Sequence, residues 1–316
     1  MEFVLDPLQL EELNEFLRGM GWMVRDRVLK AERIGMGNMN FTVRIWMKQG
    51  SFILKQARPW VVKYPQIAAP IERAAVEAGF YRVTAGASGV SSQMPQLLGF
   101  SGAAHLLWLE DLGEGADFMD CYQSQNLEPE ECRRLTEFLV NLHTLEVPIE
   151  AKEQLRNRAM RGLNHEHQYD LPLRKETGFA DVAGELREDR DYCRRIADLG
   201  KRYLSDGEVL VHGDFFPGSW LRAKGGIAII DPEFCYLGDA EYDVGVFLAH
   251  LELLQARHLW TVVESCYSRP IDWKLARRYA GAELMRRLIG VAQLPVRGSL
   301  DEKKLWLDFS RELVCA

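Results

Sequence analysis

The chain has 316 residues, of which 47% are hydrophobic and 27% charged, a composition typical of a globular protein with a sizeable core and about two domains. Its formal net charge is −7 at pH 7, and its pI is about 5.6. These values argue against a general nucleic-acid binder, which needs a basic face for phosphates, but a small anionic ligand in a locally positive pocket stays open.

The first third of the chain predicts a short helix, then strands around one more helix. Residues 7–19 place leucines and a phenylalanine at helical spacings, whereas residues 33–57 run through glycines into the alternating apolar positions of strands. Residues 69–85 are rich in alanine and carry a proline near their start, which favours a helix. Residues 94–115 predict two more strands joined by a Ser-Gly turn.

The rest of the chain is mainly helical in pattern. Residues 128–145 align apolar side chains on one face behind an acidic first turn, and residues 150–205 are charged with helical spacing. Two short strands at 219–223 and 227–231, joined by a Lys-Gly-Gly turn, interrupt the helices, which then resume.

This order of elements predicts an α+β fold with two domains. We expect a small, β-rich domain over residues 1–110 and a larger, mostly helical domain over residues 111–316.

One segment concentrates four reactive side chains among apolar runs: His212, Asp214, Asp231 and Glu233. Buried carboxylates are costly unless a metal, a cation or hydrogen bonds satisfy them. A tight turn presents Asp214, and a hairpin then brings Asp231, 17 positions later (231 minus 214), back beside it. Two such carboxylates suit a division of labour, in which one accepts a proton from a hydroxyl and the other holds Mg²⁺ on phosphate oxygens.

A glycine-rich turn in the N-terminal part suits a phosphate. In GMGNMN, Gly35 and Gly37, with the adjoining Asn38, allow backbone N–H groups to approach phosphate oxygens. By itself such a turn also occurs in ordinary hairpins, so it gains weight only from its neighbours.

A lysine follows in the next predicted strand. Lys55 lies among apolar neighbours, where its charge needs an anion. Glu77 on the following helix is the partner that we expect, and Glu72 is the weaker alternative.

The motifs of the chain resemble, in their order, those of the aminoglycoside phosphotransferase/choline kinase-like superfamily: the glycine loop, the strand lysine, the helix glutamate, LLWLEDLG, HGDFFPGS, IDPEF and GDAEYDVG. The resemblance extends from about residue 30 to residue 295. Proteins of that superfamily have a bilobal, protein-kinase-like fold and phosphorylate small molecules. The resemblance therefore implies an N-lobe and a C-lobe with ATP between them and Mg²⁺ on its phosphates.

The resemblance also implies a role for each motif. Asp214 corresponds to the catalytic base, Asp231 to a Mg²⁺ ligand and Lys55 to a phosphate contact. The WLEDL segment corresponds to the hinge that binds adenine, with Glu110 and Leu112 as the contacts.

Other residues near these motifs are interpreted as supports. His212 is a structural hydrogen-bonding residue, because Asp214 already fills the role of base. Asp243 in EYDVG is expected to accept backbone N–H groups of the catalytic loop, and His143 to be a packed helix residue. Glu233 is expected to bind sugar hydroxyls or to support the metal.

Five dispersed segments are similar to the S-methyl-5-thioribose kinases within this superfamily: KQARPWV, RAAVEA, LNHEHQY, DPEF and RRLIGVAQL. In that family paired arginines help to bind the substrate or the transferring phosphoryl group, so the resemblance gives this role to Arg286 and Arg287. Ser219 stands where most of the superfamily has a metal-binding asparagine, and the thioribose kinases share Gly-Ser at this place. Ser219 is therefore a candidate metal ligand, and equally an argument for a weakened second metal site or an inactive enzyme.

The favoured function is an ATP-dependent kinase that phosphorylates the anomeric hydroxyl of a sugar such as 5-methylthioribose, giving the 1-phosphate. An aminoglycoside kinase stays open and would favour an acidic pocket. A choline or ethanolamine kinase also stays open and would need an aromatic cage, for which Trp220, Trp260 and Trp273 are available. The remaining alternative is a nucleotide-binding pseudokinase, for which Ser219 is the main argument.

We expect no secretory signal, because the first residues have neither a basic region nor an uninterrupted apolar run. No stretch reaches the roughly 18 apolar residues that a membrane span needs. Its six cysteines are far apart and form no CxxC pair, so neither a zinc site nor a disulfide framework is predicted. We expect a cytoplasmic protein whose partner is a small-molecule hydroxyl substrate, with no nucleic acid or membrane partner, and a homodimer stays open.

Overall fold

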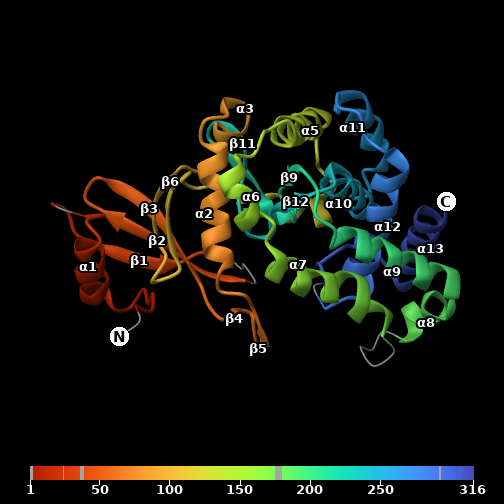
Figure 1. Cartoon of the computed structure of the whole chain (residues 1–316), viewed down its shortest axis with the longest axis horizontal. Coiled ribbons are helices and arrows are strands. Elements are labelled where there is room, and N and C mark those ends of the chain that lie inside the picture. The colour runs from red at the N-terminus through yellow and green to blue at the C-terminus, as the bar shows by residue number, and fades with distance from the viewer. Residues whose placement is uncertain (1–2, 24, 36–38, 175–179, 292) are drawn as a thin grey trace.

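The computed structural model describes residues 3–23, 25–35, 39–174, 180–291 and 293–316. Strands dominate the end of the molecule that carries the N-terminus, and helices dominate the end that carries the C-terminus (Figure 1). This arrangement agrees with the β-rich and helical parts that the sequence predicts.

The N-terminal part is built on a five-stranded antiparallel sheet in the order β1-β2-β3-β7-β6. Its strands are β1 (Lys30–Arg33), β2 (Asn40–Met47), β3 (Gly50–Ala57), β6 (Leu97–Ser101) and β7 (Leu106–Glu110). Successive side chains of a strand point to opposite faces of its sheet. Leu54 of β3 packs with helix α1 (Leu10–Gly19), whereas the next residue, Lys55, contacts helix α2 (Arg73–Thr84) on the other face.

A hairpin and a short helix of this part were not predicted. A hairpin of β4 (Trp60–Val61) and β5 (Tyr64–Ala68) follows β3 and extends past the end of α2 (Figure 1). The short helix α3 (Ser88–Ser91) then connects α2 to β6.

The second part consists mainly of helices: α4 (Cys121–Ser124), α5 (Pro129–His143), α6 (Ile149–Leu155), α7 (Arg158–His165), α8 (Ala180–Glu188), α9 (Arg190–Tyr203), α10 (Ala240–Leu253), α11 (Trp260–Cys266), α12 (Trp273–Ile289) and α13 (Leu300–Cys315). Helix α5 begins at Pro129 because Glu128 and Glu131 form a capping box around it. Helices α10 and α12 pack against each other and are buried on nearly all sides, which makes them the centre of this part.

Short strands interrupt the helices and position the segment between residues 208 and 239. Strand β9 (Val209–Val211) pairs with β12 (Tyr236–Gly238), and β10 (Trp220–Ala223) pairs with both β11 (Gly226–Ile229) and β8 (Ala116–Asp117). The sequence predicts only the β10–β11 hairpin, and it places the end of the second strand at residue 231, two residues too late. Strands β9, β12 and β8 are too short to show a period of two.

Among the described residues, no helix has both the length and the apolar character needed to cross a lipid bilayer. All six cysteines are free thiols.

Candidate active site

An ion-paired lysine joins the two parts of the molecule. Lys55 Nζ lies 2.8 Å from Glu77 Oε1 and 2.8 Å from Asp231 Oδ1. Burial disfavours a charged lysine, but the carboxylates of Asp231 and Glu77 outweigh it and raise the pKa of Lys55 well above its usual value. Lys55 is therefore a fixed cation, and its partner on α2 is Glu77, the residue favoured over Glu72 in the sequence.

The two carboxylates that share this lysine differ in environment. Glu77 is fully buried, and burial raises its pKa to about 7 against the opposing charge of Lys55. The Asp231 side chain is 42% exposed. Asp231 therefore has a carboxylate face open to a ligand, whereas Glu77 serves the lysine alone.

The backbone around Asp231 is held in an unusual conformation. Asp231 has φ 61° and ψ 50°, a left-handed conformation that costs a residue with a side chain about 1–2 kcal/mol. The turn that follows packs on the loop after β9, where Gly213 has φ 84° and a Cβ would lie 2.0 Å from Phe234 O. Only glycine fits there, so the loop that carries Asp214 and the turn that carries Asp231 lie directly against each other.

Asp243 on α10 fixes the backbone of the loop after β9. Its carboxylate accepts the backbone N–H of His212 at 2.6 Å and that of Gly213 at 2.9 Å, the contacts that the sequence predicts for it. His143 Nε2 lies 3.1 Å from Asp243 Oδ2, and His143 Nδ1 lies 2.8 Å from the hydroxyl of Tyr267. His143 is thus packed, as expected, but it also orients Asp243, a role that its position in a helical pattern does not reveal.

His212 is buried and bonded to the backbone. Its Nε2 lies 3.0 Å from Ile230 O, and burial lowers its pKa. A neutral His212 that donates from Nε2 joins the β9 loop to the end of the β10–β11 hairpin, so its environment fits a structural residue rather than an acid or base.

Asp214 lies against the two arginines of RRLIGVAQL. Asp214 Oδ1 is 3.0 Å from Arg287 Nη2 and 3.7 Å from Arg286 Nη1, and the aspartate side chain is 16% exposed. The structure therefore brings together residues that are 73 positions apart. One carboxylate oxygen of Asp214 is engaged by the arginines.

Glu283 holds both arginines and was not singled out in the sequence. It lies three and four residues before them on α12, and its carboxylate is 3.0 Å from Arg286 Nη1 and 2.6 Å from Arg287 Nε. Burial alone would raise the pKa of Glu283, but the two guanidinium groups together lower it well below its usual value. The spacing of i, i+3 and i, i+4 was the signal available in the sequence.

The protein oxygens near the two aspartates suit a Mg²⁺ ion whose other coordination positions are filled by phosphate oxygens and water. Ser219 is buried, and its hydroxyl donates a hydrogen bond to Asp214 O at 3.0 Å. The lone pairs of the Ser219 hydroxyl oxygen therefore remain available to a metal ion. No group of three or more His, Cys, Asp or Glu side chains in the described part of the chain forms a metal cage. Mg²⁺ commonly takes one or two protein oxygens and completes its octahedron with phosphate oxygens and water, and exposed Asp231 with Ser219 fits that pattern.

Glu233 has partners that the sequence did not predict. Its Oε2 accepts from Asn40 Nδ2 at 2.8 Å and lies 3.3 Å from Arg73 Nε. Arg73 is fully buried and also donates to the carbonyl of Met39. Glu233 therefore ties the end of the glycine loop to the turn after Asp231.

The glycine loop itself is described only in part. Gly35 has φ 70°, a conformation that favours glycine, whereas Gly37 and Asn38 lie outside the described residues.

The segment after β7 is fixed by Asp111, which lies between the predicted adenine contacts Glu110 and Leu112. Asp111 accepts from Arg44 Nη2 at 3.0 Å and from Ser51 Oγ at 2.6 Å. Glu110 pairs with Gln96 through its backbone N–H at 2.9 Å, and Leu112 follows directly after Asp111. Asp111 thus anchors this segment to β2 and β3, a role that the sequence did not suggest.

The tryptophans considered for an aromatic cage do not gather. Trp220 is fully buried and packs against Phe215 and Phe247. Trp260 contacts Phe309, and Trp273 contacts Tyr267, on other elements. These three residues therefore form no cage for a quaternary ammonium group.

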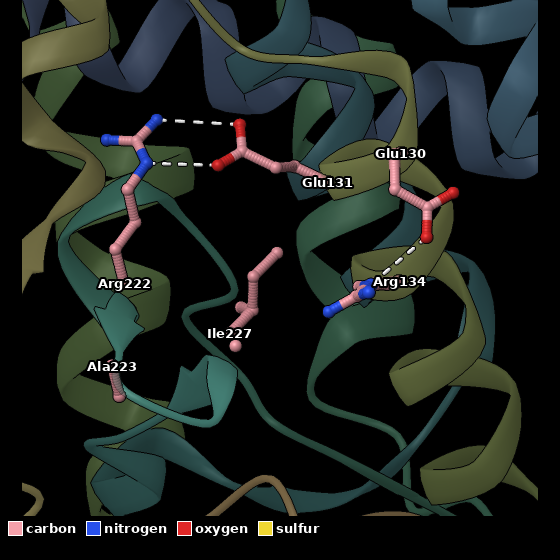
Figure 2. Close-up of a pocket in the computed structure, with 7 residues that line it drawn as sticks. Glu130, Glu131, Arg134, Arg222, Ala223 and Ile227 are labelled. Carbon is pink, nitrogen blue, oxygen red and sulfur yellow. Dashed lines mark hydrogen bonds and ion pairs between the residues drawn. The ribbon is translucent and has the colours of Figure 1, made fainter.

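A charged surface pocket of about 220 Å³ is a separate feature. Its lining residues are Glu130, Glu131, Arg134, Arg222, Ala223, Gly226 and Ile227, and none of the predicted site residues is among them (Figure 2). Arg222 donates to Glu131 at 3.0 Å, and Arg134 donates to Glu130 at 3.1 Å. The charged side chains of this pocket are therefore paired with one another.

Sequence comparison identifies relatives of this architecture. The model of the phosphotransferase enzyme family matches residues 31–261, which is more than half of the chain. The methylthioribose kinase of Pectobacterium carotovorum is 24% identical over an alignment that covers 95% of this chain and 90% of that protein. The methylthioribose kinase of Klebsiella pneumoniae is 27% identical over 72% of this chain, and the match spans only 60% of that kinase.

Solved structures share the fold. Spectinomycin phosphotransferase APH(9)-Ia, in complex with ADP and spectinomycin, has a TM-score of 0.58 at 16% identity and covers 98% of this chain and 99% of that chain. Choline kinase LicA from Streptococcus pneumoniae has a TM-score of 0.57 at 12% identity and covers 96% of this chain and 99% of that chain. The protein-kinase-like α+β fold predicted from the sequence is confirmed, and the chain belongs to the phosphotransferase enzyme family.

Proposed function

We propose that this chain is an ATP-dependent kinase that transfers the γ-phosphoryl group to a hydroxyl of 5-methylthioribose, giving the sugar 1-phosphate. The observation that carries the proposal is the bridge from Lys55 to both Glu77 and Asp231, together with a second aspartate, Asp214, that is engaged by arginine. In protein kinases the lysine–glutamate pair and the metal-binding aspartate must both be in place for phosphoryl transfer. The methylthioribose kinases among the relatives support the choice of acceptor.

In this proposal the reacting groups divide the work. Asp214 orients the acceptor hydroxyl and accepts its proton, because Arg287 engages one of its oxygens and the side chain remains partly exposed. Lys55 binds phosphate oxygens, and Arg286 and Arg287 balance the charge of the transferring group. Mg²⁺, when bound, neutralises charge on the phosphates, and Asp231 with Ser219 would hold it.

The nucleotide would lie between an N-terminal domain of residues 1–110 and a C-terminal domain of residues 111–316. Asp111 supports this placement because it fixes the segment that would receive the adenine. Besides Lys55, the residues proposed to hold the nucleotide are Gly35, Gly37, Asn38, Glu110 and Leu112.

Glu233 has a changed role in the proposal. Because its carboxylate is occupied by Asn40 and Arg73, we assign it to the join between the glycine loop and the Asp231 turn rather than to the sugar.

The charges around Asp214 favour a neutral sugar over a cationic acceptor. Arg286 and Arg287 lie beside Asp214, and among the described residues the buried Glu283 is the other carboxylate that contacts both of them. Two positive and two negative charges leave no excess of negative charge for a polyamine such as an aminoglycoside. The dispersed tryptophans give no support to choline.

The test is mass-spectrometric detection of a phosphorylated product after incubation with Mg-ATP. Parallel samples contain 5-methylthioribose, ribose, choline or an aminoglycoside, and Asp214→Asn is the control protein. A thioribose phosphate formed by the wild type and lost in the variant is the expected result. Nucleotide binding without any product would favour a pseudokinase, and a product from choline or an aminoglycoside alone would replace the proposed acceptor.

A further inference from the structure

Glu283 is fully buried at the centre of a polar cluster. Besides the two arginines, it accepts from Gln168 Nε2 at 3.1 Å and lies 3.2 Å from His250 Nε2. A buried carboxylate with four side-chain partners from α10, α12 and the turn after α7 is strongly fixed, because moving it would leave several buried donors unsatisfied.

Two partners of Glu283, His250 and Gln168, are oriented by hydrogen bonds to buried tyrosines. His250 Nδ1 lies 2.6 Å from the Tyr122 hydroxyl, and burial lowers the pKa of His250 to about 4, so the ring is neutral and its Nε2–H points at Glu283. Gln168 Oε1 accepts from the Tyr242 hydroxyl at 3.0 Å, which directs its amide N–H groups towards the carboxylate.

The local backbone explains how Gln168 reaches this position. Residues Glu166–Asp170 form a π-helical turn, and both Gln168 and Tyr169 of this turn are buried. Such wide turns are rare and occur frequently at functional sites. The LNHEHQY segment resembles a segment of the thioribose kinases, and it contributes Gln168 to the cluster.

The arginines transmit this arrangement to Asp214. Arg287 uses Nε for Glu283 and Nη2 for Asp214, so one planar guanidinium group spans the two carboxylates. The ring of Phe216 covers the same guanidinium group, with its centroid 4.6 Å from Arg287 Cζ. The position of Asp214 Oδ1 therefore depends on the position of Glu283.

We propose that Glu283 is a positioning residue of phosphoryl transfer: through Arg287 and Arg286 it sets the orientation of Asp214 and of the charges that receive the transferring group. This inference rests on the proposed function, in which Asp214 acts on the acceptor hydroxyl. Glu283 itself touches neither the acceptor nor the nucleotide in this assignment.

The test compares Glu283→Asp with a matched control. Glu283→Asp keeps the charge and withdraws the carboxylate by one methylene. Glu264→Asp makes the same change at a partly exposed ion pair, between Glu264 on α11 and Arg277 on α12. We measure kcat and KM with Mg-ATP and 5-methylthioribose, and the Kd for Mg-ADP on the same preparations. A displacement of about 1 Å at a reacting group costs on the order of 10²-fold.

The expected result is a kcat about 10²-fold lower for Glu283→Asp, with the Kd for Mg-ADP and the KM for ATP unchanged, while Glu264→Asp behaves as wild type. A wild-type kcat for Glu283→Asp would overturn the proposal. If Glu283→Asp does not fold, Gln168→Leu removes one donor without altering the charge of Glu283, and a wild-type kcat for that variant would overturn it equally.

A crystal structure of Glu283→Asp separates this inference from the proposed function. We expect Arg287 to move away from Asp214, whatever the acceptor of the enzyme is. An unchanged contact between Arg287 and Asp214 would contradict the positioning role. An inactive wild type with a displaced Arg287 in the variant would contradict only the proposed function.

Discussion

Lys55 and Asp231 are 176 positions apart in the chain, yet the lysine Nζ lies 2.8 Å from an oxygen of the aspartate. The contact joins the central strand of the N-terminal sheet to the turn after β11. Because Glu77 on α2 contacts the same nitrogen, three elements meet at one charge. The proposed phosphoryl transfer depends on this meeting point.

Replacing Lys55 by methionine should remove the ion pairs that join these three elements. The variant keeps the apolar stem but leaves the buried Glu77 and the nearby Asp231 without their cation. We expect kcat/KM for ATP to fall by about 10²–10³-fold, the range found when one charge-stabilising group is removed. Steady-state kinetics check this, with exposed Lys63→Met as the control. A variant with the kcat/KM of the wild type would exclude Lys55 from phosphate binding.

Asp243→Ala should destabilise the loop that carries Asp214, and with it the folded protein. The change leaves the N–H groups of His212 and Gly213 without their acceptor, and His143 without a partner at Nε2. Each buried donor left unsatisfied costs about 1–3 kcal/mol, so we expect the free energy of unfolding to fall by at least about 2 kcal/mol. Urea denaturation measures it, and exposed Asp308→Ala is the control. Equal stability of the two variants would contradict the structural role of Asp243.

Gly213→Ala tests the close approach of the two loops. The new Cβ would meet Phe234 O at 2.0 Å, at a residue with φ 84°. We expect a loss of about 1–3 kcal/mol in the free energy of unfolding, from overpacking and backbone strain. Gly225→Ala in the β10–β11 turn is the matched control, because a Cβ there meets nothing within 4 Å. A Gly213→Ala protein as stable as the control would show that the loops are not in contact.

The pH dependence of stability should carry the signature of Glu283. Its two arginines, acting against burial, lower its pKa in the folded state below the ordinary value of 4.5, so the unfolded chain binds the proton more tightly. The resulting stability is fully present above that ordinary value and is lost progressively as the pH falls below it. Glu283→Gln should therefore lose more unfolding free energy at pH 7 than at pH 4, in urea denaturation. Equal losses at both pH values would contradict this assignment.

The reactive motifs were predictable because each is local. The alternation around Lys55, the turn before Asp214 and the apolar helix that carries Asp243 are written in neighbouring residues. The order of these motifs was enough to predict the fold and the family. Glu77 was also accessible, since the helix after β3 offers few carboxylates to a lysine.

The residues that were missed act through long-range contacts. Glu283 lies within four residues of its arginines in the sequence, but its burial beside Gln168 and His250 follows from the packing of α10 against α12. Asp111 anchors a segment through Arg44, which is 67 positions away. The end of β11 was misplaced because Asp231 adopts a left-handed conformation that its sequence does not announce. Such contacts are set by tertiary structure rather than by spacing.

We propose that Asp214 acts on the acceptor hydroxyl. The most direct measurement is single-turnover transfer from radiolabelled ATP to 5-methylthioribose, by the wild type and by Asp214→Asn, with Mg-ADP binding measured on the same preparations. We predict that the variant binds Mg-ADP as the wild type does and transfers phosphate about 10²–10⁴-fold more slowly. Transfer by Asp214→Asn at the rate of the wild type would contradict the account.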